Sequence, residues 1–155
     1  MPNALSRGIA GGALGTIALN MTTYLDMAIR GRPSSTVPED DVQRLADRIG
    51  VDLSAGVSDE QVESRMQALG ALMGYVTGLS IGAVYGLLRS FAPDVPRPVA
   101  AVALGLGAMA ATDGVTVLLG NADPREWSAS SWLSDIVPHL AYGAVTVAGY
   151  ESFGD

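Results

Sequence analysis

The chain has 155 residues, no cysteine and a formal net charge of −7. The missing cysteine excludes disulfides, thiolate nucleophiles and cysteine metal sites, and the acidic balance argues against nucleic acid as a partner. Hydrophobic residues make up 48% and charged residues only 16%, against roughly 25% charged in a typical soluble domain. We therefore expect a single membrane domain, residues 1–155, that crosses the inner (plasma) membrane several times.

The first hydrophobic stretch, residues 5–28, predicts a membrane-spanning helix. It carries two overlapping pairs of small residues, Gly8 with Gly12 and Gly11 with Gly15. Small residues four positions apart share a helix face and let a second helix approach closely. We therefore expect both pairs to face another helix of the bundle.

Residues 29–67 form the only sizeable extramembrane segment that the sequence predicts. Thr36 and Glu39 have the spacing of a capping box, and a short amphipathic helix is expected to follow them. Two interpretations of this helix are open: it caps its own bundle, or its apolar face docks a partner. The candidate docking residues are Val42, Leu45 and Ile49.

The second hydrophobic stretch, residues 68–88, has a glycine at every fourth position. In water each interior glycine would cost a helix about 1 kcal/mol relative to alanine, whereas in lipid the backbone must be helical. We expect these glycines to form one stripe that packs against another helix of the same chain. They are Gly70, Gly74, Gly78, Gly82 and Gly86. Large side chains such as Tyr75, Leu79 and Tyr142 are expected on outer surfaces.

Two further hydrophobic stretches, residues 99–119 and 132–150, complete four predicted spans joined by short loops. Most arginines fall in the first and third loops. This bias predicts that those loops are cytoplasmic and that both termini lie outside.

Four polar residues, Asn20, Asp113, Asp135 and His139, lie inside the predicted spans. At 1.5 Å of rise per residue, Asn20, Asp113 and His139 reach a common depth, with Asp135 nearer the surface. Asp135 and His139 are also four residues apart on one helical face. Such groups either hydrogen-bond one another and hold the bundle in register, or form a proton or cation relay.

No nucleophile elbow, phosphate-binding loop, zinc-protease motif or dinucleotide fingerprint is present. One histidine with two carboxylates could bind a metal, but the spacing defines no metal site. We therefore predict no enzyme activity, no catalytic residue, no cofactor and no metal.

The runs Pro96–Asp113 and Trp132–Gly143 resemble small uncharacterised four-helix membrane proteins of actinobacteria. This resemblance implies an accessory subunit of an envelope complex, such as a mycobacterial Mce-type lipid importer. The sequence thus predicts an all-α integral membrane four-helix bundle with a short amphipathic helix in the first loop. Its predicted function is that of a non-catalytic accessory or stabilising subunit, with other membrane protein subunits and the lipid bilayer as partners. The alternative is a small transporter or channel that uses the intramembrane Asp/His cluster.

Overall fold

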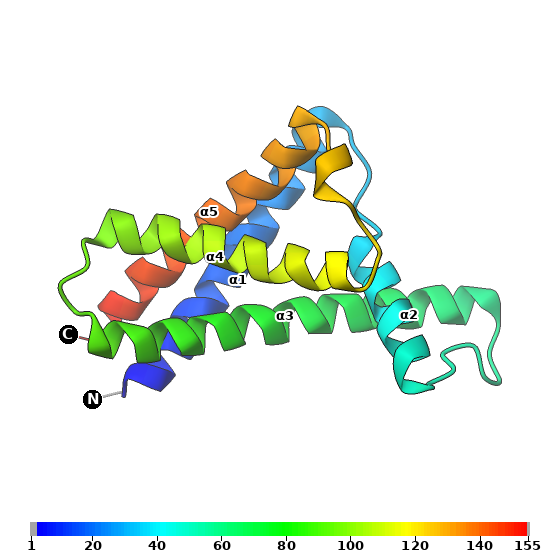
Figure 1. Ribbon diagram of the computed structural model, residues 1–155, viewed down its shortest axis with the longest axis horizontal. Coiled ribbons are helices and arrows are strands. Elements are labelled where there is room, and N and C mark those ends of the chain that lie inside the picture. The colour runs from blue at the N-terminus through cyan, green and yellow to red at the C-terminus, as the bar shows by residue number, and fades with distance from the viewer. Residues whose placement is uncertain (1–2, 155) are drawn as a thin grey trace.

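The computed structural model describes residues 3–154, and this part of the chain is helical without any strand (Figure 1). In chain order the elements are α1 (Ala4–Arg30), α2 (Val37–Ile49), α3 (Asp59–Phe91), α4 (Arg97–Leu118), the 3-10 turn η1 (Pro124–Glu126) and α5 (Ala129–Ser152).

The helix ends follow from local capping chemistry. Asn3 begins α1 by accepting a hydrogen bond from the Ser6 backbone N–H at 2.8 Å. Ser58 and Gln61 form a reciprocal capping box at the start of α3. The predicted capping box at Thr36 is wrong, because the Thr36 hydroxyl donates to the Asp40 carboxylate instead of capping the backbone.

Helix α1 is the central element of the bundle. It packs along α3 and along α5, while α5 also packs against α4 and α2 packs against α3. In Figure 1, α1 and α5 run together across the horizontal pair α3 and α4. Both ends of the chain lie at the same end of the molecule, where the four long helices converge. The four helices separate towards the opposite end of the molecule, where α2 and the first and third loops lie.

Glycine lets α1 touch α3 backbone to backbone. A Cβ atom added to Gly12 would lie 2.7 Å from the Gly78 carbonyl oxygen, and one added to Gly82 would lie 2.6 Å from the Gly12 Cα. The second small pair of α1 faces a different neighbour, since a Cβ on Gly11 would lie 2.6 Å from the Thr146 carbonyl oxygen on α5. The two glycine pairs therefore form two separate helix–helix contacts of α1, one with α3 and one with α5.

The predicted glycine stripe of α3 divides into three parts. Gly78, Gly82 and Gly86 face α1, while Gly70 faces α2, where an added Cβ would lie 3.2 Å from Pro38. The prediction that the whole stripe is buried is wrong at Gly74, which is exposed and has no neighbouring atom within 4 Å of an added Cβ. The reason is geometric: straight helices that cross touch over only a few turns, and α1 has left α3 at that level.

Tyr142 does not lie on an outer surface, as the sequence had suggested, but is 1% exposed. Its hydroxyl donates to the Gly78 carbonyl oxygen at 2.6 Å, which links α5 to α3. Gly15 of α1 makes room for the ring, because a Cβ there would lie 2.9 Å from Tyr142 Cδ2. A tyrosine can be buried where its hydroxyl finds an acceptor.

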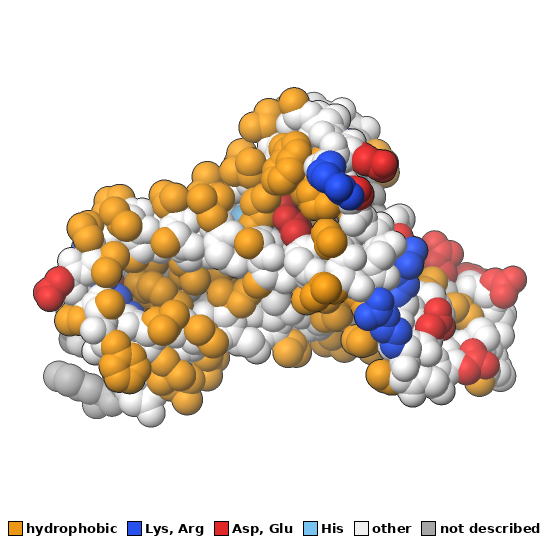
Figure 2. Space-filling view, in the orientation of Figure 1, with side chains coloured by type: hydrophobic (Ala, Val, Ile, Leu, Met, Phe, Trp, Pro, Cys, Tyr) orange, Lys and Arg blue, Asp and Glu red, His pale blue; other side chains and the backbone are white. Residues whose placement is uncertain are grey.

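Two helices, α3 and α4, are long and apolar enough to cross a membrane. Only 22% of the residues in each apolar stretch are buried, whereas the core helix of a soluble protein is mostly buried. Figure 2 shows apolar side chains over the outer faces of the long helices, with most of the visible charge around α2 and the third loop.

Candidate functional site

The seam between α4 and α5 brings three of the four predicted polar residues together. The seam is another backbone contact: a Cβ on Gly105 would lie 2.6 Å from the His139 carbonyl oxygen, and one on Gly143 would lie 2.6 Å from the Gly105 nitrogen. This contact fixes the register of the two helices. Asp113 of α4 is thereby placed next to Asp135 and His139 of α5, and the three residues form the acid–histidine cluster.

Within the acid–histidine cluster, His139 is held by its own helix. Its Nδ1 atom lies 3.1 Å from the Asp135 carboxylate oxygen Oδ1 and 2.9 Å from the Asp135 carbonyl oxygen. Its Nε2 atom lies 3.5 Å from the Thr112 hydroxyl on α4. The other carboxylate oxygen, Asp135 Oδ2, is buried without a hydrogen-bond partner among residues 3–154. The cluster can therefore hold and exchange a proton, since a histidine beside a carboxylate is a proton acceptor.

Metal binding has no comparable support. Across residues 3–154, no three histidine, cysteine, aspartate or glutamate side chains are arranged to hold a metal ion.

Asn20, the fourth predicted residue, does not join the cluster. It is half-buried on α1, and its side chain has no hydrogen bond to any residue within the described range 3–154. It lies one helical turn beyond Thr16, which faces Gly78 of α3. A matching depth in the bundle does not bring Asn20 to the cluster, because Asn20 lies on the side of α1 that faces α3 and not on a side that faces α4.

Between the level of the acid–histidine cluster and the end that holds the chain termini, the contact between α1 and α5 is tightly packed. Tyr142 and Thr146 are the largest fully buried side chains there, at 1% and 0% exposure. Thr16 is also buried, and its hydroxyl donates to the Gly12 carbonyl oxygen at 2.8 Å. The backbone contacts through Gly11 and Gly15 fill the surrounding space. This filled contact lies between α1 and α5, whereas the acid–histidine cluster lies between α4 and α5.

Sequence reasoning missed a second polar centre, which joins α2 to the end of α4. The buried Asp41 carboxylate accepts hydrogen bonds from the Thr116 hydroxyl at 2.6 Å and the Asn121 amide at 2.9 Å. Arg44 and Arg48 of α2 donate to the carbonyl oxygens at the end of α4, which a helix leaves unpaired. One feature of the sequence could have indicated this centre: the charged residue Asp41 lies next to Val42, on the apolar side of an amphipathic helix.

The three candidate docking residues of α2 have different surroundings. Val42 is buried in the molecule at 7% exposure, together with Ala46. Leu45 and Ile49 are 44% and 67% exposed. Helix α2 thus caps its own bundle with one part of its apolar face and leaves the other part open.

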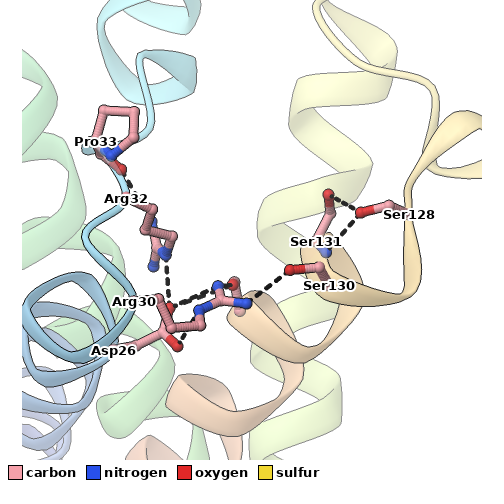
Figure 3. Close-up of polar contacts among 8 residues, drawn as sticks. Asp26, Arg30, Arg32, Pro33, Ser128, Ser130 and Ser131 are labelled. Carbon is pink, nitrogen blue, oxygen red and sulfur yellow. Dashed lines mark hydrogen bonds and ion pairs between the residues drawn. The ribbon is translucent and has the colours of Figure 1, made fainter.

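A further ion-pair cluster ties the end of α1 to the start of α5 (Figure 3). Asp26 pairs with Arg30 at 2.8 Å and with Arg32 at 2.5 Å. Arg30 also donates to the Ser130 hydroxyl at 2.6 Å and to the Ser134 hydroxyl. These bonds keep α1 and α5 together where both have separated from α3.

Comparison of the chain with protein-family models, curated proteins and solved structures found no match.

Proposed function

We propose that this chain is a multi-pass protein of the inner membrane whose four long helices all cross the bilayer. Helices α1, α4 and α5 have 27, 22 and 24 residues, and about 20 residues suffice to cross roughly 30 Å of hydrocarbon. Large apolar side chains are exposed on each of the four helices, for example Ile17, Val76, Val102 and Leu133. Water would make so much exposed apolar surface costly, whereas lipid would not.

Within the membrane, the proposed role is that of a non-catalytic accessory subunit of a larger envelope complex. The main observation in support of this role is that part of the apolar face of α2 is exposed. Leu45 and Ile49 stay exposed although α2 is anchored to α4 through Asp41 and Arg48. An anchored helix with a free apolar edge outside the lipid suits contact with another subunit.

The partners on this proposal are other membrane protein subunits. The resemblance of Pro96–Asp113 and Trp132–Gly143 to actinobacterial membrane proteins points to a lipid-transporting envelope complex as the assembly to search first.

Co-purification from native membranes tests the role. The tagged chain is extracted in mild detergent and the proteins that elute with it are identified. Leu45→Asp and Ile49→Asp should release the partner while the melting temperature of the bundle is retained, because both side chains are exposed. Phe91→Asp is the matched control, since it places the same charge on an 85% exposed side chain at the other end of α3. Retention of every partner by both α2 variants contradicts the proposed role.

A second candidate function is a small proton or cation transporter. The observation that favours it is the meeting of Asp113, Asp135 and His139 between two helices. Intramembrane ionisable residues are costly and often mark ion paths. Tyr142 and Thr146 fill the contact between α1 and α5, so a path between those two helices is blocked, which supports the accessory role.

Proteoliposomes loaded with a pH-sensitive dye separate the two functions. A transporter gives a flux that depends on the pH gradient, and Asp113→Asn abolishes this flux while the fold is kept. An accessory subunit gives no flux above that of empty liposomes.

A further inference from the structure

Three arginines from three helices meet at the end of the molecule that holds the chain termini. Glu151 of α5 lies between two of them, 2.7 Å from Arg97 Nε and 3.6 Å from Arg89. Arg7 of α1 donates from Nε to the Tyr150 carbonyl oxygen at 3.0 Å, and its guanidinium lies 4.2 Å from the centre of the Tyr150 ring. Each guanidinium is therefore held in place by α5.

The terminal nitrogens of Arg97 are open to a ligand, whereas those of the half-buried Arg7 lie against Gly154 at the edge of a groove that both arginines line. Arg97 is 75% exposed and engages Glu151 through Nε. Within residues 3–154, neither arginine donates a hydrogen bond from its terminal nitrogens to a protein acceptor. Arg89 is different, because its Nη1 atom donates to the carbonyl oxygens of Ala92 and Val95. Arg89 thus orients Glu151, Arg97 faces outwards, and the half-buried Arg7 lines the groove beside it.

A groove of about 640 Å³ begins at these two arginines. Such a volume is within the roughly 300–1,000 Å³ of ordinary ligand sites. Its mouth holds Arg7, Arg97 and Glu151, and its continuation along α4 and α5 is lined by Ala101, Ala144 and Ala148. These alanines lie one to two helical turns further into the span than Glu151 and Arg97. The groove is therefore cationic at the helix ends and apolar towards the middle of the helices.

We infer that this groove binds an anionic phospholipid, with the headgroup phosphate on Arg7 and Arg97 and an acyl chain along the alanines. Guanidinium groups pair with phosphate oxygens through two parallel hydrogen bonds. Helix ends lie at the depth of the lipid phosphates, and small side chains leave room for a chain next to the helices. The inference rests on the membrane placement proposed above and not on the accessory role.

Native mass spectrometry of the full chain in detergent tests the inference, with phosphatidylglycerol and phosphatidylcholine of equal chain length as probes. We expect roughly a tenfold preference for phosphatidylglycerol. The double variant Arg7→Gln/Arg97→Gln should lose this preference. The matched control is Arg125→Gln, which removes the same charge from an 89% exposed arginine at the other end of the molecule. Equal retention of both lipids by the wild type, or an unchanged preference in the double variant, would overturn the inference.

A second variant separates a lipid from free phosphate and keeps both arginines. Ala148→Phe fills the apolar part of the groove at an exposed position. A lipid site should lose phosphatidylglycerol on this change, whereas a site for inorganic phosphate alone would not. Full displacement of phosphatidylglycerol by millimolar inorganic phosphate, together with undiminished lipid binding by Ala148→Phe, would show a free-anion site and refute the lipid. Loss of bound lipid with retention of the α2-dependent partner would leave the accessory role intact.

Discussion

A single buried hydroxyl shows how polar groups connect these helices. Tyr142 is the most buried aromatic residue, and its hydrogen bond to Gly78 joins α5 to the glycine face of α3. In a low-dielectric interior an unpaired hydroxyl or carbonyl is costly, so this bond fixes the register of two helices that are not neighbours in the chain.

At this scale, Tyr142→Phe tests the bond with almost no change in packing volume. We expect a loss of about 1 kcal/mol of stability, the usual net contribution of a hydrogen bond. For a chain of this size that corresponds to a fall of roughly 2–4 °C in the melting temperature. Tyr75→Phe is the matched control, because Tyr75 is 49% exposed. Equal melting temperatures for Tyr142→Phe and wild type in detergent would show that the bond contributes nothing.

At the scale of elements, α2 is attached to the bundle through polar contacts more than through apolar area. Only Val42 and Ala46 of its apolar face are buried, whereas Asp41 accepts two hydrogen bonds from the end of α4 and its loop. Hydrogen bonds to a charged group contribute about 1.5–3 kcal/mol.

Asp41→Ala should therefore release α2 without unfolding the long helices. The variant removes the carboxylate that Thr116 and Asn121 share as an acceptor. Limited proteolysis should then cut within residues 33–58 at least several times faster than in wild type, since local opening is governed by local stability. Asp40→Ala is the control on the same helix, because Asp40 is exposed. Unchanged cleavage in Asp41→Ala would mean that apolar contacts alone hold α2.

Two positions of one glycine stripe provide the sharpest test of helix packing. Gly82→Leu places a side chain against the α1 backbone, whereas Gly74→Leu points into open space. Overpacking typically costs about 1–3 kcal/mol, so Gly82→Leu should lower the melting temperature in detergent by several degrees and Gly74→Leu should not. A stable Gly82→Leu protein would show that α1 and α3 are not in backbone contact.

The helices could be predicted from the sequence, but which helices pack against one another could not. The four-residue glycine repeat predicted a packing face, yet it could not show that α1 leaves α3 before Gly74, because crossing angles depend on side chains of both helices. Likewise, depth alone grouped Asn20 with Asp113 and His139, although helix rotation decides which side chains meet. Asp135 and His139 were predictable as neighbours because their contact is local to one helix.

For the whole molecule, charges gather at the two ends of the long helices. Asp26, Arg30 and Arg32 lie at one end, while Arg89, Arg97 and Glu151 lie at the other. The acid–histidine cluster between α4 and α5 is the exception. This distribution is consistent with the proposed membrane placement, since ion pairs at helix ends can stay hydrated.

The chain contains no cysteine, so single cysteines can report the topology without any background. Ala55→Cys and Glu126→Cys place thiols in the first and third loops, and Asp94→Cys and Ser152→Cys place them at the other end; all four positions are exposed. If four helices cross the bilayer, a membrane-impermeant maleimide added to intact spheroplasts will label one pair and spare the other. Permeabilisation should then expose all four, which controls for reactivity. If Ser152→Cys is labelled from the same side as Glu126→Cys, α5 does not cross the membrane. Labelling of all four thiols in intact spheroplasts would contradict the membrane-spanning bundle altogether.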